Sequence, residues 1–184
     1  MSKRSFLKEF IRENKTVGSL TPSSRFLASK MVDNIDYTST KVIIELGPGT
    51  GVFTRRIAKN LPDNVILLVF ELNDEFYLQL TDEFKQPNIV IIHDSADQLL
   101  KYLKEYNFEF ADVVISSLPL ANFDETLRSS ILNKVYESLH EKGKFVQFQY
   151  SLQAKKILMS LYKEVKIGFT ALNIPPAFVY KCIK

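Results

Sequence analysis

From residue 41 onward, the sequence alternates between short apolar runs and amphipathic segments. The apolar runs lie at 41–46, 64–71, 88–94, 111–116 and 143–150, and the early ones are nearly continuous in Val, Ile and Leu. Each is followed by a segment in which apolar residues recur at helical spacing, at 51–61, 73–84, 96–106, 124–140 and 152–163. Near-continuous apolar strands are typical of a parallel sheet covered by helices on both faces. The pattern therefore predicts an α/β, Rossmann-like, doubly wound fold.

The last two apolar runs break this alternation. Residues 165–172 and 177–183 both favour strands, and only the short segment "NIPPA" lies between them. Two strands joined without a helix predict an antiparallel hairpin. We therefore expect seven strands, mostly parallel, with a C-terminal antiparallel hairpin at one edge of the sheet.

The first predicted helix, over residues 3–14, is amphipathic and basic. Residues 1–15 hold five basic and two acidic side chains, a net charge of +3 that equals the net charge of the whole chain, so the remaining charges cancel. A basic amphipathic helix suits the surface of an anionic membrane, and packing of its apolar face on the protein's own core is the alternative. The residues proposed for membrane contact are Lys3, Arg4, Phe6, Leu7, Phe10 and Ile11.

A second helix is predicted to begin at "TPSS" (21–24), with Thr21 as its N-cap. It would run to about residue 34 and bury Phe26, Leu27 and Met31. The loop at 18–24 is a candidate lid over a bound ligand, or else an ordinary loop and helix cap. We accordingly divide the chain into an N-terminal amphipathic helix and lid segment, residues 1–40, and an α/β domain, residues 41–184.

Composition indicates an ordinary globular domain. The chain has 184 residues, of which 46% are hydrophobic and 24% charged. No run approaches the roughly 20 apolar residues of a membrane span, and the N-terminus lacks the apolar stretch of a secretory signal. One cysteine, Cys182, excludes an internal disulfide. We expect a cytoplasmic protein, and no cluster of Cys and His residues points to a metal.

The strongest local signal is the turn "ELGPGTG" (45–51) after the first strand. Its glycines allow a tight turn and a close approach of the backbone to a ligand. Glu71 ends the second strand, where a carboxylate can accept hydrogen bonds from ribose hydroxyls. Asp94 ends the third strand, where a carboxylate could bond an adenine amino group, and Ser95 follows it. Because parallel strands end at the same edge of a sheet, these tips predict one nucleoside pocket.

The identity of the nucleoside follows from what the turn lacks. A dinucleotide-binding turn needs G-x-G-x-x-G, but the last position here is Val52 or Thr54, and no phosphate-binding loop is present. The acidic Glu45 suits a ligand that bears an ammonium group rather than a pyrophosphate. "ELGPGTG", with Glu71 and Asp94, resembles the pattern of Rossmann-like S-adenosylmethionine-dependent methyltransferases. The alternative is an α/β protein whose glycines only shape a turn. The cofactor-binding residues implied are Glu45, Gly47, Pro48, Gly49, Thr50, Gly51, Glu71, Leu72, Asp94, Ser95, Ala96 and Ser116.

The fourth strand ends in "SSLPL" (116–120), at the acceptor end of this site. Methyl transfer from a sulfonium needs positioning and desolvation rather than a strong acid or base. In adenine N6-methyltransferases and ribosomal RNA adenine dimethylases, this tip resembles N-[LIP]-P-[YF], whose aromatic residue stacks on a flipped base. Here Ser117 replaces the Asn and Leu120 the aromatic residue. Those dimethylases also usually carry a helical domain after the last strand, whereas this sequence ends at Lys184. Both differences weaken the case for an RNA substrate.

Two tyrosines are candidates for contact with the acceptor. Tyr150 ends the fifth strand and Tyr180 lies in the last. An aromatic face attracts a partly methylated ammonium by about 0.5–2 kcal/mol, although packing in the core or at its rim is the alternative. The residues proposed for the methyl-transfer site are Ser116, Ser117, Leu118 and Tyr150. The Ser117 hydroxyl or nearby carbonyls would orient the amine.

Nearly the whole chain resembles the bacterial phospholipid N-methyltransferase family. The matching segments are "FLKEFIRENKTVGSLTPSSRFLASKM", "ELGPGTGVFT", "SSLPL", "FVQFQYS" and "NIPPAFVY". The resemblance implies stepwise methylation of phosphatidylethanolamine toward phosphatidylcholine, with S-adenosylmethionine as methyl donor, on the inner face of the membrane. The implied partners are an anionic membrane surface and the phospholipid, and no obligate protein partner is inferred. A ribosomal RNA adenine methyltransferase, a small-molecule methyltransferase and a nonenzymatic adaptor remain alternatives, so nucleic acid is disfavoured but not excluded.

Overall fold

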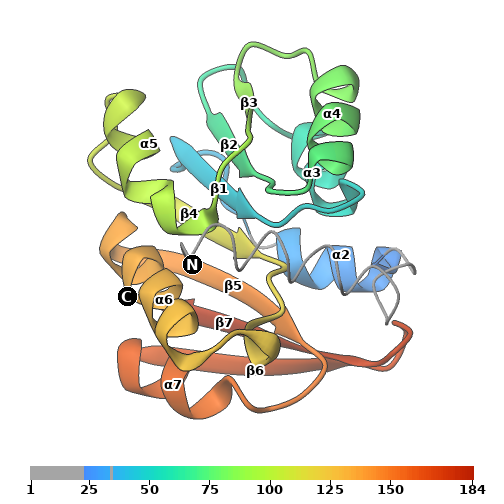
Figure 1. Cartoon of the computed structure of the whole chain (residues 1–184), viewed down its shortest axis with the longest axis vertical. Helices are drawn as coiled ribbons and strands as arrows, with labels where there is room; N and C mark the ends of the chain where they lie inside the picture. The colour runs from blue at the N-terminus through green and yellow to red at the C-terminus, as the bar shows by residue number, and fades with distance from the viewer. Residues whose placement is uncertain (1–22, 34) are drawn as a thin grey trace.

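A computed structural model describes residues 23–33 and 35–184, which are organised around one seven-stranded sheet (Figure 1). The strand order is β3-β2-β1-β4-β5-β7-β6. Strands β1 to β5 run parallel, and β7 lies antiparallel between β5 and β6. The strands are β1 (Val42–Leu46), β2 (Ile66–Phe70), β3 (Ile89–Ile92), β4 (Ala111–Ser116), β5 (Leu139–Gln149), β6 (Glu164–Thr170) and β7 (Ala177–Ile183).

Helices cover both faces of this sheet (Figure 1). Buried side chains of α2, α3 and α4 form one core with the strands, and those of α5, α6 and α7 form the other. The predicted doubly wound fold with a C-terminal hairpin is therefore confirmed. The helices are α2 (Arg25–Val32), α3 (Val52–Ala58), α4 (Asp74–Glu83), α5 (Leu99–Glu105), α6 (Glu125–Ser138) and α7 (Lys155–Leu161), with short 3-10 turns η2 (Ala96–Gln98) and η3 (Leu120–Asn122).

The apolar runs are continuous because the central strands are buried on both faces. All five residues of β1 are buried, and they alternate between the two cores, with Ile43 in one and Ile44 in the other. The exception is Glu45, a carboxyl group with no exposed surface. A buried acid in a central strand is costly unless something compensates it, which marks this position as functional.

Strand β5 begins earlier than the sequence pattern predicts. It starts at Leu139, where it pairs with Ala111, and pairing resumes at Lys144 after an irregularity. Within that irregularity Lys142 has φ +71°, and a Cβ on Gly143 would lie 2.8 Å from the carbonyl oxygen of His140. Because this tight segment is mostly polar, the sequence pattern did not indicate that the strand begins at Leu139.

Helix α2 differs from its prediction at its start. It begins at Arg25, and the Ser24 hydroxyl accepts a hydrogen bond from the Leu27 amide at 3.2 Å, so Thr21 is not its cap. Leu27 and Met31 are buried as expected, but Phe26 is 40% exposed, because the helix turns this residue away from the sheet. The amphipathic helix predicted at 3–14 and most of the candidate lid lie outside the described residues.

The carboxyl ends of β1 to β6 share one edge of the sheet, which we call the carboxyl edge. This follows because β5 and β6 are both antiparallel to β7 and therefore run in the same direction. The loops that leave these strands, including the β6–β7 connection at 171–176, thus lie on the same side of the molecule. All predicted cofactor and acceptor residues fall on or beside this edge. Among the described helices, none is long and apolar enough to cross a membrane.

Candidate functional site

The turn after β1, residues 47–51, is shaped by three glycines with positive φ. Their φ angles are +68°, +55° and +79° for Gly47, Gly49 and Gly51. A Cβ on Gly47 would lie 2.9 Å from Leu118 Cδ2, and one on Gly51 would lie 2.7 Å from Leu80 Cδ2, so a larger residue at either position would displace a leucine side chain and would be strained by the positive φ. A Cβ on Gly49 would meet nothing within 4 Å. The backbone at Gly49 is therefore open to a ligand, while its neighbours are packed from below.

Glu71 fastens this glycine turn to the end of β2. Its Oε2 accepts a hydrogen bond from the Gly49 amide at 3.0 Å, and its Oε1 accepts one from the Asn73 amide at 2.8 Å. The side chain is only 5% exposed, and burial raises its pKa, although these amide hydrogen bonds oppose the shift. A carboxylate offers about four acceptor positions, so two remain for a pair of ribose hydroxyls.

The end of β3 carries the third set of polar groups. Asp94 Oδ1 accepts from the Ser95 amide at 2.7 Å, and Asp94 Oδ2 accepts from the Tyr102 hydroxyl at 3.1 Å. The Ser95 hydroxyl is buried and has no hydrogen-bond partner within the described part of the chain. Asp94 is thus held in place, and the buried Ser95 hydroxyl beside it is available for a hydrogen bond to a ligand.

Glu45 lies below the glycine turn, and burial strongly perturbs its carboxyl group. Neither of its carboxyl oxygens makes a hydrogen bond of ordinary geometry to a described residue, although the hydroxyl and amide of Thr54 lie close enough to favour its ionised form. Burial raises the pKa of Glu45 to about 8, Thr54 opposes the shift, and the negative charge of Glu71 adds to it. Orphaned buried oxygens, together with an open backbone at Gly49, fit a ligand that carries an ammonium group and a nucleoside.

We expect binding of the methyl donor to release a proton from Glu45. At pH 7 a carboxyl with a pKa of about 8 is mostly protonated, and a nearby ligand ammonium would favour its ionised form. Calorimetry at pH 7 in buffers of different ionisation enthalpy measures the release, which Glu45→Gln should abolish. An equal release from wild type and variant would contradict this assignment.

The same pKa shift gives a pH dependence of stability. The pKa of Glu45 in the folded protein lies above the ordinary value of 4.5. Between these values the folded protein binds a proton that the unfolded chain has lost, so stability without ligand falls as pH rises through this window. The Glu45→Gln variant should lack this contribution.

The acceptor loop, residues 117–123, is tied to the glycine turn. The Ser117 amide donates to the Leu46 carbonyl at 2.9 Å, and the Leu118 side chain packs over Gly47. The Ser116 hydroxyl is buried and accepts from the Leu118 amide at 3.3 Å, so it holds the loop. Ser117 is half-buried, which leaves its hydroxyl as the better placed of the two to meet an acceptor.

Two glutamines of β5, which sequence reasoning missed, fix the acceptor loop from below. Gln147 Nε2 and Gln149 Nε2 both donate to the Leu118 carbonyl, at 3.1 and 2.9 Å, and we call this pair the glutamine clamp. The Ala121 amide in turn donates to Gln149 Oε1 at 3.4 Å. The Leu120 amide also donates to the Leu118 carbonyl, at 2.8 Å, so this oxygen with its two lone pairs is already fully used. The sequence held one signal for this contact, because the two glutamines are two residues apart and so lie on one face of an otherwise apolar strand.

The two tyrosines occupy different environments. Tyr150 is 47% exposed at the carboxyl edge, and its ring meets Phe148 edge-on with centroids 5.6 Å apart. Tyr180 has no exposed surface, and its hydroxyl donates to the Ser151 carbonyl at 3.2 Å. The suggestion that Tyr180 presents an aromatic face to a ligand is wrong, because this ring belongs to the core. Tyr150 keeps an accessible ring for such a contact.

Leu120 does not provide a platform for a base. It begins the short turn η3, is 1% exposed and packs within the core on the α6 side of the sheet. Stacking on a flipped base needs an accessible ring at this position. The acceptor loop therefore lacks the surface that an adenine would use there.

The fold and the polar groups at the carboxyl edge define a class I S-adenosylmethionine-dependent methyltransferase. The family model described as "Ribosomal RNA adenine dimethylase" matches residues 12–165, and the chain belongs to this family. It is also 30% identical to an ornithine lipid N-methyltransferase of Singulisphaera acidiphila, over 96% of this chain and 93% of that protein. The predicted likeness to lipid N-methyltransferases related to the dimethylases is thereby confirmed, as are the methyltransferase activity and its cofactor, S-adenosylmethionine.

In relatives named as ribosomal RNA methyltransferases, the similarity to this chain covers a smaller share of the relative's own length. The Ribosomal RNA small subunit methyltransferase A of Malacoplasma penetrans is 29% identical over 89% of this chain but only 55% of that protein. Among solved structures, the N-methyltransferase NodS of Bradyrhizobium japonicum has a TM-score of 0.67, with 87% of this chain and 95% of that chain covered at 14% identity. At that identity the likeness supports the fold alone.

Proposed function

We propose that this enzyme methylates a primary amine on a lipid head group, at the cytoplasmic face of the membrane. The observation that carries the proposal is the similarity to an ornithine lipid N-methyltransferase along nearly the full length of both chains. Phosphatidylethanolamine, converted stepwise toward phosphatidylcholine, is the acceptor we expect. Ornithine lipid offers the same chemistry, a primary amine on a lipid, and is the first acceptor to compare with it.

The residues of the site divide the work of binding and positioning. Glu71 accepts hydrogen bonds from the ribose hydroxyls. Asp94 and Ser95 hold the adenine, and Glu45 faces the ligand ammonium. When bound, S-adenosylmethionine supplies a methyl group on a sulfonium that is already activated for transfer. The Ser117 hydroxyl accepts a hydrogen bond from the incoming amine, which must be neutral to attack.

A ribosomal RNA adenine methyltransferase is the second candidate, because the family model is described by that activity. The structure offers less for it. Leu120 is buried where a stacking aromatic residue would stand, and the Leu118 carbonyl already accepts two hydrogen bonds from the glutamine clamp. An amine that approached this loop would meet Ser117 and Tyr150 instead.

The acceptor is tested directly with a labelled methyl donor. The enzyme is offered vesicles that contain phosphatidylethanolamine, vesicles that contain ornithine lipid, and ribosomal RNA in separate reactions. We expect label in the lipid fraction, and the first two reactions distinguish the head groups. Label in RNA with none in either lipid would overturn the proposal.

Membrane contact by residues 3–14 remains a proposal, and Phe10→Glu tests it. A charge placed on the apolar face of an interfacial helix should abolish binding to anionic vesicles while affinity for S-adenosylhomocysteine is kept. Vesicle flotation and calorimetry measure the two quantities. Unchanged flotation would indicate that this face packs on the protein itself.

A further inference from the structure

The charge of the chain is strongly segregated outside residues 1–15. Residues 142–184 hold eight lysines and one acidic residue, Glu164, a net charge of +7. Residues 16–141 hold eleven basic and eighteen acidic residues, a net charge of −7. The neutral sum of these two parts therefore conceals a basic and an acidic portion of the protein.

The topology places these portions at opposite ends of the sheet. The basic segment forms most of β5 together with α7, β6 and β7, and β7 and β6 close one end of the strand order. Helix α4, with Asp74, Glu75, Asp82 and Glu83, lies by β3 at the other end (Figure 1). Such a distribution turns the β6–β7 end toward an anionic surface.

The basic end also carries exposed apolar side chains, which we call the apolar rim. Two of its members lie in the β6–β7 connection, one lies in the loop between β5 and α7, one is on α7 and one is near the end of β6. Their exposed fractions are 79% for Ile174, 62% for Leu172, 55% for Met159, 51% for Phe169 and 46% for Leu152. Several large apolar side chains exposed at the same end of the sheet indicate an interaction surface.

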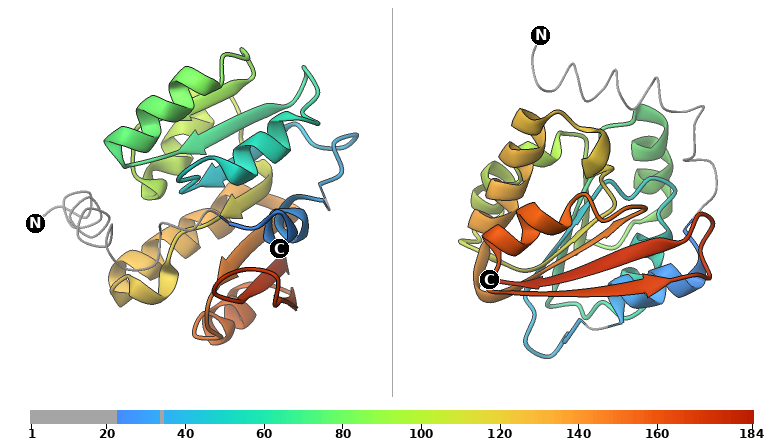
Figure 2. Two further views of the ribbon diagram at one scale, coloured as in Figure 1. Left: turned by 90° about the vertical axis from the view of Figure 1, so that its right-hand side faces the viewer. Right: turned by 90° about the horizontal axis from the view of Figure 1, so that it is seen from below.

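The exposure of Leu172 and Ile174 is built into the β6–β7 connection. Asn173 between them is 3% exposed, its Nδ2 donates to the Pro175 carbonyl at 2.8 Å, and its Oδ1 accepts from the Ser24 amide at 2.8 Å. This anchor holds the tip of the hairpin against the start of α2, which lie together in the view from below (Figure 2). Because Asn173 points inward, its two apolar neighbours project outward.

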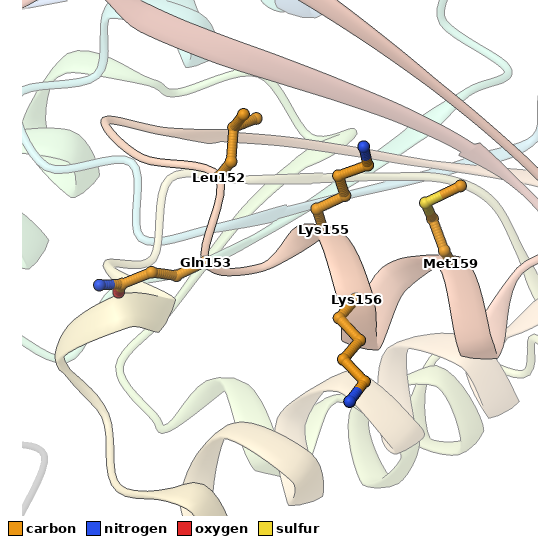
Figure 3. A pocket seen from close by; sticks show the side chains of 5 residues that line it. All are labelled: Leu152, Gln153, Lys155, Lys156 and Met159. Carbon is orange, nitrogen blue, oxygen red and sulfur yellow. The ribbon is translucent and has the colours of Figure 1, made fainter.

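Two lysines stand among the apolar side chains. Lys155 and Lys156 line a pocket of about 420 Å³ with Leu152, Gln153 and Met159, at the start of α7 (Figure 3). Both lysines are exposed, and neither has an ion-pair partner among the described side chains. Apolar side chains beside unpaired lysines suit an interface with hydrocarbon below and anionic head groups above.

We propose that the apolar rim, with Lys155 and Lys156, seats the described domain on an anionic bilayer. This rests on the proposed lipid acceptor and deepens it, since it adds a second membrane surface outside residues 3–14. The rim lies at or near the carboxyl edge, so seating it brings the acceptor loop and Tyr150 toward the head groups. The enzyme would then meet its acceptor amine without extracting the whole lipid from the bilayer.

Other occupants fit this surface less well. A second copy of the chain would bring two portions of net charge +7 together, and these repel. RNA would satisfy the lysines, but its phosphates offer nothing to exposed Leu, Ile and Met side chains. A bilayer satisfies both kinds of group at once.

The test is binding of the full chain to vesicles, measured by flotation. Leu172→Ser with Ile174→Ser, and separately Lys155→Glu with Lys156→Glu, should each weaken binding to phosphatidylglycerol-containing vesicles at least tenfold. The matched apolar control is Leu78→Ser, a residue 64% exposed on α4 at the far end of the sheet. The charge control is Lys59→Glu with Lys104→Glu, two exposed residues at the ends of α3 and α5, away from the carboxyl edge.

Controls should bind like wild type, and every variant should keep its affinity for S-adenosylhomocysteine. Rim variants that float like wild type would overturn the inference. So would rim-dependent self-association in sedimentation, or rim-dependent RNA binding, with vesicle binding unaffected. Rim-dependent vesicle binding by an enzyme that methylates neither lipid would support the rim while refuting the proposed acceptor. The two proposals can thus fail separately.

Discussion

Glu71→Ala is expected to raise the dissociation constant for S-adenosylmethionine about a hundredfold. The variant loses two hydrogen bonds from the ribose to a carboxylate, and each bond to a charged group contributes about 1.5–3 kcal/mol. It also frees the Gly49 amide, which Glu71 Oε2 holds at 3.0 Å, so the glycine turn is less well ordered for binding. Isothermal titration with S-adenosylhomocysteine measures the loss without turnover.

Two further variants separate ribose binding from a general loss of structure. Glu75→Ala removes an exposed acid from the first turn of α4 and should leave affinity within twofold of wild type. Glu71→Gln keeps one acceptor oxygen and should fall between wild type and Glu71→Ala. A folded Glu71→Ala protein with an unaltered dissociation constant would remove Glu71 from the ribose role.

The cofactor end of this site was predictable from sequence because it depends on strand ends. Once the apolar runs are recognised as parallel strands, Glu71 and Asp94 must lie on the same edge as the glycine turn. The roles of these residues stay predictions, but their grouping follows from topology. Similarly, the lack of a helix between the last two strands was enough to predict their antiparallel pairing.

The supports of the acceptor loop were not predictable in the same way. The glutamine clamp depends on the register of β5 against β4, which pairs Gln147 with Ser116, and on a loop that folds back over β5. No local pattern encodes such a contact between a side chain and a distant carbonyl. Charge segregation was missed for a related reason, since a sum over the chain ignores which segments the fold gathers at one end.

Replacing both glutamines of the clamp by methionine should reduce kcat about tenfold to a hundredfold while affinity for the methyl donor stays within twofold. Methionine has a similar length but cannot donate, so the buried Leu118 carbonyl keeps only the hydrogen bond from the Leu120 amide at 2.8 Å, and each lost hydrogen bond costs about 0.5–1.5 kcal/mol. The acceptor loop would then shift, and displacement by about 1 Å can cost a hundredfold in rate. Single-turnover kinetics, with the acceptor identified in the vesicle assay, separate this effect from product release.

The contrast between rate and affinity is what identifies the clamp as positioning the acceptor loop. Gln149→Met alone leaves Gln147 on the carbonyl and should lose less than the double variant. Gln79→Met, at an exposed position on α4, controls for the substitution itself. If the double variant weakened donor binding as much as it slowed transfer, the glutamines would be general supports of the fold. If it did neither, the Leu120 amide would suffice for the Leu118 carbonyl, and the acceptor loop would not depend on β5.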